Sequence, residues 1–307
     1  MHEHIARVLY HCQIHLLYAS AVGLAAWALT SIRRGSATTK YWIWVAAALH
    51  FVVPVGAVLD KIEASHLSWA RPLGVVGDFA NNISDGMPGL VIGIIWLTGA
   101  SVMFVRLIVR LRAESRHAQA AGPAALPASS LLADLPVRFT ATRQGPAVEG
   151  VLHPQISLPR GIERVLSERE LDAVLLHEMR HAKRRDNLIR LFYELALCAL
   201  WFHPLVWLAG ARLALYREMS CDESVIAQAH GEELVSALAK LAEPEEVFLL
   251  QAGASSFLSH RLERLSAPTR PASRVMSAML TLAFVAFLAW SVFSTMAHTA
   301  CCFVHRP

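Results

Sequence analysis

Four long apolar segments constrain the fold of this chain more than any other feature. They cover residues 13–32, 41–59, 89–107 and 275–297. Each is close to the roughly 20 residues that an α-helix needs to cross the hydrocarbon core of a bilayer. Charged residues make up only 17% of the chain, whereas about 25% is usual in soluble domains. We therefore predict a mainly α-helical, polytopic membrane protein with about four transmembrane helices.

Positively charged residues set the predicted orientation of these helices. Arg33, Arg34 and Lys40 lie in the first short connection, and most of the 28 lysines and arginines lie between residues 106 and 274. Lysine and arginine are enriched in loops on the cytoplasmic side. We therefore predict that the first connection and the central region are cytoplasmic and that both termini lie outside. The net charge of +4 is modest and gives no reason to expect direct binding of nucleic acid.

The central region contains the segment SERELDAVLLHEMRHAKRRDN, which begins at Ser167. Ser167 and Glu170 form the S-x-x-E pattern of a capping box, and apolar residues follow at helical spacing. We predict a helix over about residues 168–186. His177 and His181 are four residues apart, so they project from one face of this helix. Such a pair of imidazoles can bind one Zn²⁺.

Glu178, beside the first histidine, completes the HExxH pattern of zinc peptidases. There it can act as the general base, because zinc lowers the pKa of a bound water toward 7. The alternative is a basic surface helix that carries His and Glu by chance. The context favours a zinc site, since the helix is well capped and a plausible third ligand follows downstream.

The segment YREMSCDES contains that third ligand. A catalytic zinc site takes three protein ligands and keeps one position open. We predict Glu218 as the third ligand, and Asp222 as the partner of the spare ring nitrogen of a ligand histidine. Glu223 is the competing carboxylate, but it projects about 100° away from Asp222. Asp186 follows a basic run, where it either orients a group at the site or forms a plain salt bridge.

These ligands constrain the apolar segment between them. If residues 188–209 crossed the membrane once, Glu218 would lie on the opposite side from His177 and no shared zinc site could form. The segment must therefore belong to a cytoplasmic core, lie along the membrane interface, or enter the membrane and return near His203 and Pro204. Pro204 is a good first-turn residue and predicts a helix from there to about residue 229.

The chain divides into four predicted regions. Residues 1–112 form a membrane region with three transmembrane helices, and residues 113–131 form a linker rich in Ala, Pro and Ser. Residues 132–270 form the cytoplasmic zinc-peptidase domain, and residues 271–307 form the fourth transmembrane helix and a short external tail. Short strands precede the zinc helix, so this domain is α+β. A strand near residues 151–158 is expected to be an edge strand to which an extended substrate could add.

The segments SLPRGIERVLSERELDAVLLHEMRHAKRRDN, WFHPLVW and REMSCDES resemble the BlaR/MecR-type family of membrane zinc metallopeptidases. The resemblance covers about residues 135–265 and the layout of four spans, although family members usually have Asn in place of His203. A more distant similarity extends to the HtpX and CAAX-processing peptidases. The resemblance implies a gluzincin-like zinc domain facing the cytoplasm of a bacterium, in its inner membrane. By resemblance, Glu178 is the base and Asp222 matches the aspartate of the second motif; the implied metal ligands are His177, His181 and Glu218.

The best-known members of this family are beta-lactam sensor-transducers, in which activation leads to loss of a DNA-binding repressor. The resemblance therefore implies a signalling protease with a cytoplasmic protein substrate, such as a transcriptional repressor. Because the chain ends soon after the last span, we expect no penicillin-binding sensor domain and no sensing of beta-lactams. The alternatives are an HtpX-like quality-control peptidase and a non-enzymatic membrane receptor or scaffold. Lys183, Arg184 and Arg185 are expected to complement the C-terminus of the helix and anionic lipid headgroups. The sequence leaves open whether the chain forms homo-oligomers.

Overall fold

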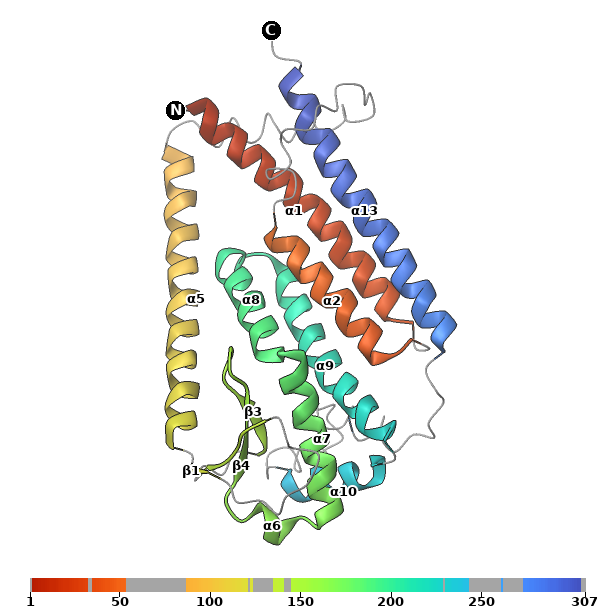
Figure 1. Cartoon of the computed structure of the whole chain (residues 1–307). Helices are drawn as coiled ribbons and strands as arrows, with labels where there is room; N and C mark the ends of the chain where they lie inside the picture. The colour runs from red at the N-terminus through yellow and green to blue at the C-terminus, as the bar shows by residue number, and fades with distance from the viewer. Residues whose placement is uncertain are drawn as a thin grey trace, which may run out of the picture. The chain divides into compact units, whose positions relative to one another are not determined.

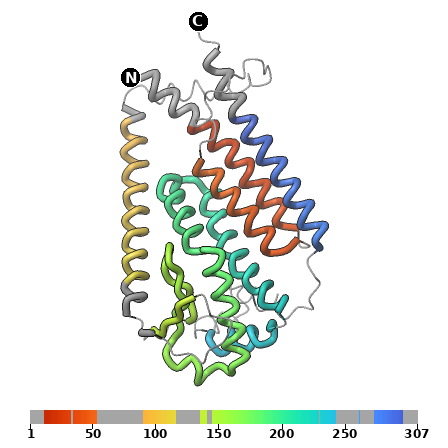
Figure 2. The backbone as a smooth tube through the Cα atoms, viewed as in Figure 1, coloured from red at the N-terminus to blue at the C-terminus, as the bar shows by residue number. Residues whose placement is uncertain are grey.

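The computed structural model of the chain is traced in Figure 2. It describes residues 2–32, 35–53, 87–120, 122–123, 135–140, 145–228, 230–242, 261 and 273–304. The chain forms two compact units. One, the helical unit, contains Met1–Phe104, Leu195–Leu213 and Ala272–Pro307. The other, the sheet unit, contains Val105–Glu194 and Ala214–Pro271.

The helical unit is built around three long helices that pack side by side (Figure 1). They are α1 (His2–Thr30), α2 (Ala37–Val52) and α13 (Arg274–Val304), and the first part of α5 (Met87–Ala120) also belongs to this unit. α2 begins at Ala37 because the Ser36 hydroxyl accepts a hydrogen bond from the Thr39 backbone N–H at 3.0 Å. Apolar side chains from α1 and α2, among them Val22 and Trp44, are fully buried between the helices.

Three helices in the described part of the chain are long and apolar enough to cross a membrane: Cys12–Thr30, Leu90–Ser115 and Arg274–Thr295. They coincide with the first, third and fourth predicted spans. The second predicted span, 41–59, is described only as far as Val53, and α2, which overlaps it, has 16 residues. Most apolar side chains of Leu90–Ser115 are exposed, which suits a helix surrounded by lipid.

Residues Leu195–Leu213 belong to the helical unit, although the chain before and after them belongs to the sheet unit. They comprise the end of α8 (Asp186–Ala199), a turn, and the start of α9 (Pro204–Ile226). The chain thus leaves the sheet unit along α8 and re-enters it along α9. The chain reverses its course between these two helices, near His203 and Pro204.

Hydrogen bonds from tryptophan side chains connect this turn to α5 within the helical unit. Trp96 on α5 donates its indole N–H to the Ala199 carbonyl at 2.9 Å, and Trp201 donates to the Trp96 carbonyl at 3.2 Å. His203 Nε2 lies 3.1 Å from the Ser20 hydroxyl of α1. Backbone carbonyls at the end of a helix lack partners within that helix, so Trp96 supplies one for α8.

The sheet unit contains a four-stranded sheet with the strand order β1-β2-β4-β3. Its strands are β1 (Gly122–Pro123), β2 (Val137–Thr140), β3 (Ala147–Glu149) and β4 (Gln155–Pro159). β2 and β4 are parallel, whereas the two outer pairings are antiparallel. Ile156 and Leu158 of β4 pack in one core with Val174 of α7 (Glu168–Arg184) and Leu234 of α10 (Gly231–Leu241). α6 (Ile162–Val165) links β4 to α7.

The predictions for strands and linker need two corrections. The prediction of an edge strand near residues 151–158 is wrong, because β4 pairs with β2 on one side and β3 on the other. β3 is the edge strand beside β4, and the Asn187 side chain donates to the Val148 carbonyl in β3 and to the Gly150 carbonyl just after it, at 2.9 and 3.1 Å. The predicted linker, 113–131, begins inside α5, which continues to Ala120.

α7 begins at the predicted residue but ends before the predicted boundary near residue 186. Ser167 accepts from the Glu170 N–H and the Glu170 carboxylate accepts from the Ser167 N–H, so the capping box is confirmed. The helix ends at Arg184, because Arg185 adopts the left-handed conformation with φ of 56°. Asp186 then starts α8 in a new direction. α9 also starts at Pro204, as predicted.

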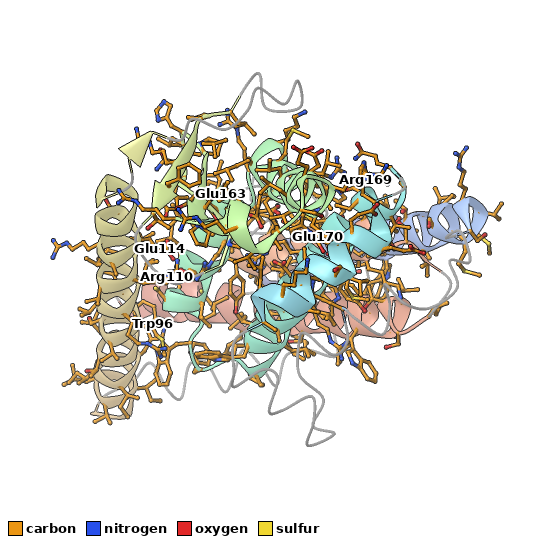
Figure 3. All side chains as sticks on the ribbon, turned by 90° about the horizontal axis from the view of Figure 1, so that it is seen from below. Trp96, Arg110, Glu114, Glu163, Arg169 and Glu170 are labelled. Carbon is orange, nitrogen blue, oxygen red and sulfur yellow. The ribbon has the colours of Figure 1, made fainter. Side chains whose placement is uncertain are left out.

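Ion pairs connect α5 to α8 within the sheet unit. Arg110 and Glu114 lie on successive turns of α5, where both are labelled in Figure 3, and are 3.3 Å apart. Arg110 also contacts Glu194 of α8, and Glu194 accepts from Arg190 at 3.1 Å. These contacts hold α8 against α5.

Candidate metal centre

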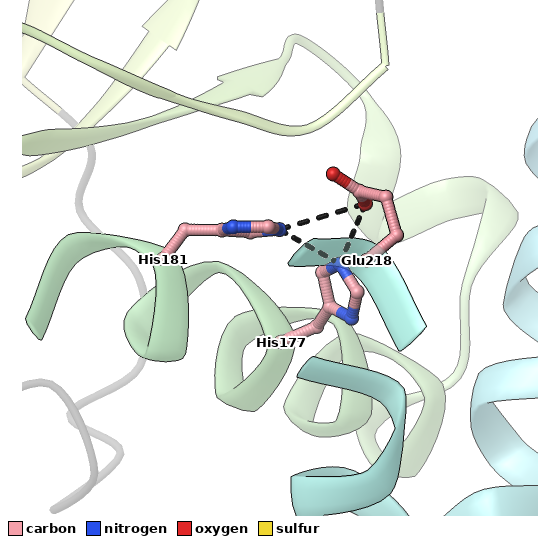
Figure 4. A group of neighbouring side chains, drawn as sticks. All are labelled: His177, His181 and Glu218. Carbon is pink, nitrogen blue, oxygen red and sulfur yellow. Dashed lines mark hydrogen bonds and ion pairs between the residues drawn. The ribbon is translucent and has the colours of Figure 1, made fainter. Parts of the chain in front are cut away.

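Three donor atoms from α7 and α9 converge inside the sheet unit (Figure 4). His177 and His181 lie one turn apart on α7, with Nε2 atoms 3.1 Å apart. Glu218 of α9 directs Oε2 toward both, at 3.3 Å from His177 Nε2 and 3.6 Å from His181 Nε2. The structure thus brings together the three residues predicted as ligands. Glu223, the competing carboxylate, does not belong to this group.

The spacing of these donors fits a tetrahedral metal ion. Zinc bonds of about 2.0–2.2 Å at tetrahedral angles separate neighbouring ligand atoms by roughly 3.3 Å. The three observed separations, 3.1, 3.3 and 3.6 Å, scatter around that value. A proton on each Nε2 would instead direct two N–H groups at one another. The donor set therefore suits a divalent cation such as Zn²⁺.

Each histidine meets a carboxylate at its other ring nitrogen. His181 Nδ1 lies 2.6 Å from Asp186 Oδ2, and His177 Nδ1 lies 3.1 Å from Asp222 Oδ1. The His181–Asp186 contact is a hydrogen bond, which fixes the tautomer and would leave the Nε2 lone pair free for a metal ion, whereas the His177–Asp222 contact is an ion-pair distance without hydrogen-bond geometry. Asp186 also accepts from Arg184 Nε at 2.6 Å, so it orients a histidine and forms a salt bridge as well.

Arg184 connects the end of α7 to α9. Its guanidinium donates to the Ser220 hydroxyl at 2.8 Å and to the Arg217 carbonyl at 3.1 Å, and it contacts Cys221 Sγ at 3.3 Å. Its side chain is 5% exposed, so the prediction that it faces lipid headgroups is wrong. Arg184 instead holds the helix of the histidines against the helix of Glu218.

The carboxylates create a negative field at the centre. Burial alone would lower the pKa of His177, but Asp222 and Glu218 raise it to about 9. Burial would also lower the pKa of His181, yet Glu218 and Asp186 raise it well above its usual value. Burial alone would raise the pKa of Glu218, but the two histidines hold this pKa well below its usual range. The centre therefore favours positive charge at the Nε2 atoms, which a bound divalent cation would supply.

Glu178 lies at the edge of a cavity of about 210 Å³ that opens beside the donor set. His177 and Glu218 also line this cavity, together with the apolar side chains of Val174, Leu234 and Leu238. Burial raises the pKa of Glu178, and the neighbouring histidines offset part of that rise. A carboxylate with a raised pKa is a better proton acceptor for catalysis near neutral pH.

Arg261 is the charged lining residue of this cavity that the sequence interpretation missed. It donates from Nε to Asp222 Oδ2 at 2.9 Å and from Nη2 to Asp222 Oδ1 at 2.7 Å. No local pattern marks it, because it lies far along the chain from Asp222 in a segment without a motif. For Arg184 the sequence does contain a signal, because Asp186, its ion-pair partner, lies only two residues further along the chain.

Comparison with known proteins identifies the family. The family model BlaR1 peptidase M56 matches residues 12–265. The regulatory protein BlaR1 of Bacillus licheniformis is 41% identical over 83 residues, which cover 27% of this chain and 14% of that relative. The methicillin resistance mecR1 protein of Staphylococcus aureus is 24% identical over 90 residues, 29% of this chain and 15% of that relative. The chain thus aligns with only a small part of each relative's length. Because the family model spans most of the sequence, as the resemblance of its motifs predicted, the chain belongs to the BlaR1 peptidase M56 family.

Proposed function

We propose that this protein is an integral-membrane zinc endopeptidase. The observation that carries the proposal is the convergence of His177, His181 and Glu218 beside Glu178 at the edge of one cavity. Three protein ligands with an adjacent carboxylate are the composition of a catalytic zinc site, in contrast to a closed structural site with four. Membership in a peptidase family supports the same reaction class.

The residues divide the work of peptide hydrolysis between them. A bound zinc ion would supply a water of lowered pKa and polarise the substrate carbonyl. Glu178 would accept a proton from the attacking water as the water oxygen bonds to the carbonyl carbon. It then delivers the proton to the amine nitrogen as the C–N bond breaks. Asp186 and Asp222 keep the two imidazoles in the orientation that binds the metal.

We propose that the zinc domain faces the cytoplasm, in the inner membrane of a bacterium. Arg106, Arg110, Arg112 and Arg274 flank the apolar parts of α5 and α13, and such residues mark the cytoplasmic ends of transmembrane helices. The α8–α9 hairpin leaves and re-enters the sheet unit, which agrees with an even number of crossings between His177 and Glu218.

We further propose that the substrate is a cytoplasmic protein, such as a transcriptional repressor. The relatives that align with this chain are a regulatory protein and a methicillin resistance protein. A regulatory role implies selective cleavage, and the cavity of about 210 Å³ admits a side chain but no folded protein. Cleavage would therefore occur in an extended segment of the substrate.

The exchange Glu178→Gln tests the reaction. The purified chain in detergent should bind one zinc ion per molecule with or without the exchange, because Glu178 is not a ligand. Proteolysis should fall by at least about 100-fold, the usual contribution of general acid–base catalysis. Glu168→Gln is the matched control, since Glu168 is exposed on the first turn of the same helix. Quantitative proteomics of native cells carrying either variant should reveal a protein that accumulates only with Glu178→Gln.

Two results would contradict the proposal. One is wild-type protein without bound zinc after purification in zinc-containing buffer. The other is unchanged proteolysis by Glu178→Gln.

A further inference from the structure

Arg261 is held rigidly at the edge of the candidate metal centre. Its side chain is 11% exposed, and two of its nitrogens donate to the two oxygens of Asp222. This two-point contact fixes the plane of the guanidinium as well as its position. The same carboxylate lies 3.1 Å from His177 Nδ1, so Asp222 positions a predicted ligand and Arg261 together.

The third guanidinium nitrogen points to the reaction centre. A guanidinium carries five N–H groups on three nitrogens, and the contacts with Asp222 use Nε and Nη2. Nη1 lies 3.7 Å from Glu218 Oε2, the same oxygen that lies 3.3 Å from His177 Nε2. That separation exceeds a hydrogen-bond distance. Arg261 also lines the cavity beside Glu178, so Nη1 is positioned for an oxygen bound there.

A purely structural role would not require this arrangement. A salt bridge with Asp222 is complete with Nε and Nη2 alone. A cation next to a zinc ion is electrostatically unfavourable unless negative charge lies nearby. The carboxylates of Asp222 and Glu218 supply this charge in the resting site, and Nη1 can stabilise further negative charge that develops in the cavity. Peptide hydrolysis creates such a charge, because addition of water moves the π electrons of the carbonyl onto its oxygen.

We propose that Arg261 is a catalytic residue that donates a hydrogen bond from Nη1 to the scissile carbonyl oxygen as that oxygen becomes negatively charged. This role rests on the proposed peptidase function. The water oxygen bonds to the carbonyl carbon, Glu178 holds the released proton, and the charge on the former carbonyl oxygen is shared with Arg261. When the C–N bond breaks, the carbonyl re-forms and the amine takes the proton. A preorganised donor of this kind lowers the barrier because it needs no reorientation during the reaction.

The test compares two zinc-directed probes on the whole chain in detergent. N-phosphoryl-leucyl-tryptophan carries a tetrahedral anion that mimics the charged oxygen, whereas acetohydroxamate chelates zinc through a small planar group. We expect Arg261→Ala to weaken binding of the phosphoryl dipeptide about 10- to 100-fold, the range for loss of one charge-assisted donor. Acetohydroxamate affinity and zinc content should stay within about twofold of wild type. Arg164→Ala, which removes an exposed arginine on α6, is the matched control.

Arg261→Lys provides a second variant if Arg261→Ala does not fold. Lysine keeps the positive charge but lacks the planar guanidinium. Arg261→Lys should therefore also bind the phosphoryl dipeptide more weakly than wild type, with little change in its affinity for acetohydroxamate. Equal affinities of wild type and both variants for the phosphoryl dipeptide, including no binding by any of them, would overturn the role of Arg261 alone. Loss of zinc from both variants would likewise overturn it, by making Arg261 a positioning residue for the ligands. Wild-type protein without zinc would overturn the proposed function itself.

Discussion

Glu170 shows how a single side chain can serve more purposes than its local pattern predicts. One carboxylate oxygen accepts from the Ser167 N–H and from Lys240 Nζ, each at 2.7 Å. The other accepts from the Ser236 hydroxyl. Glu170, labelled in Figure 3, therefore caps its own helix and also ties α7 to α10. The sequence predicts the first role, since Ser167 is three residues away, but contains no signal for partners about 70 positions distant.

These contacts make the stability of the sheet unit depend on pH. Lys240, Ser236 and Ser167 lower the pKa of Glu170 from 4.5 to about 2. A carboxyl whose pKa is lower in the folded state stabilises that state above its unfolded pKa, and this contribution disappears as the pH falls through the folded pKa. Wild-type protein should therefore lose stability from about pH 5 down to pH 2. Glu170→Gln should melt at a lower temperature than wild type at pH 7 and show a smaller further decrease by pH 3.

Thermal unfolding of the whole chain in detergent at pH 7, 5 and 3 measures this difference. Glu163→Gln is the control, because Glu163 is exposed on α6. Parallel pH curves for wild type and Glu170→Gln would show that the carboxylate of Glu170 does not supply this dependence.

At the scale of helices and strands, α5 packs closely against the α8–α9 turn at Gly99. A Cβ on Gly99 would collide with the indole ring of Trp201, whereas a Cβ on Gly93 would meet no atom within 4 Å. Both glycines lie in the same apolar helix. The Trp201 ring cannot move freely, because its N–H donates to the Trp96 carbonyl. Gly99 therefore permits the close contact between the helix and the turn.

The two glycines predict opposite effects of the same substitution. Gly99→Ala should destabilise the protein by about 1–3 kcal/mol, as expected for overpacking. Gly93→Ala should be neutral or stabilise by up to about 1 kcal/mol, because alanine is the better helix former. Unfolding in mixed detergent and SDS, followed by circular dichroism, measures both. A decrease in stability of equal size for both variants would contradict the contact between Gly99 and Trp201.

Sequence patterns predict those elements whose causes are local. The capping box at Ser167 and the proline at Pro204 fix the starts of α7 and α9, and the spacing of His177 and His181 fixes their common face. The position of β4 is different, because it depends on pairing with β2, which a local pattern does not encode. Arg261 was missed for the same reason, since only the folded chain brings it to Asp222.

At the scale of the whole molecule, the donor set connects two segments that the sequence separates. His177 and His181 belong to α7, while Glu218 follows the excursion of Leu195–Leu213 into the helical unit. A metal ion held by all three would therefore close a long loop of the chain. A ligand that binds only the folded state stabilises it by mass action.

Metal removal should accordingly destabilise the protein. At a free zinc concentration 100-fold above the dissociation constant, the stabilisation is about 2.7 kcal/mol. We expect 1,10-phenanthroline to lower the melting temperature of wild-type protein and added zinc to restore it. His177→Ala should respond to neither, because one of three ligands is missing. A wild-type melting temperature that is insensitive to both reagents would argue against the metal centre.

The tryptophans at the α8–α9 turn provide an intrinsic fluorescence signal from this part of the molecule. Besides Trp96 and Trp201, Trp207 donates its indole N–H to the Trp201 carbonyl at 2.7 Å. Three of the eight tryptophans in the chain thus belong to one hydrogen-bonded chain of contacts. Indole emission shifts in wavelength when its hydrogen bonds or packing change. With the other five tryptophans replaced by phenylalanine, intrinsic fluorescence of the purified, reconstituted protein would report rearrangements of this turn in real time and without a label.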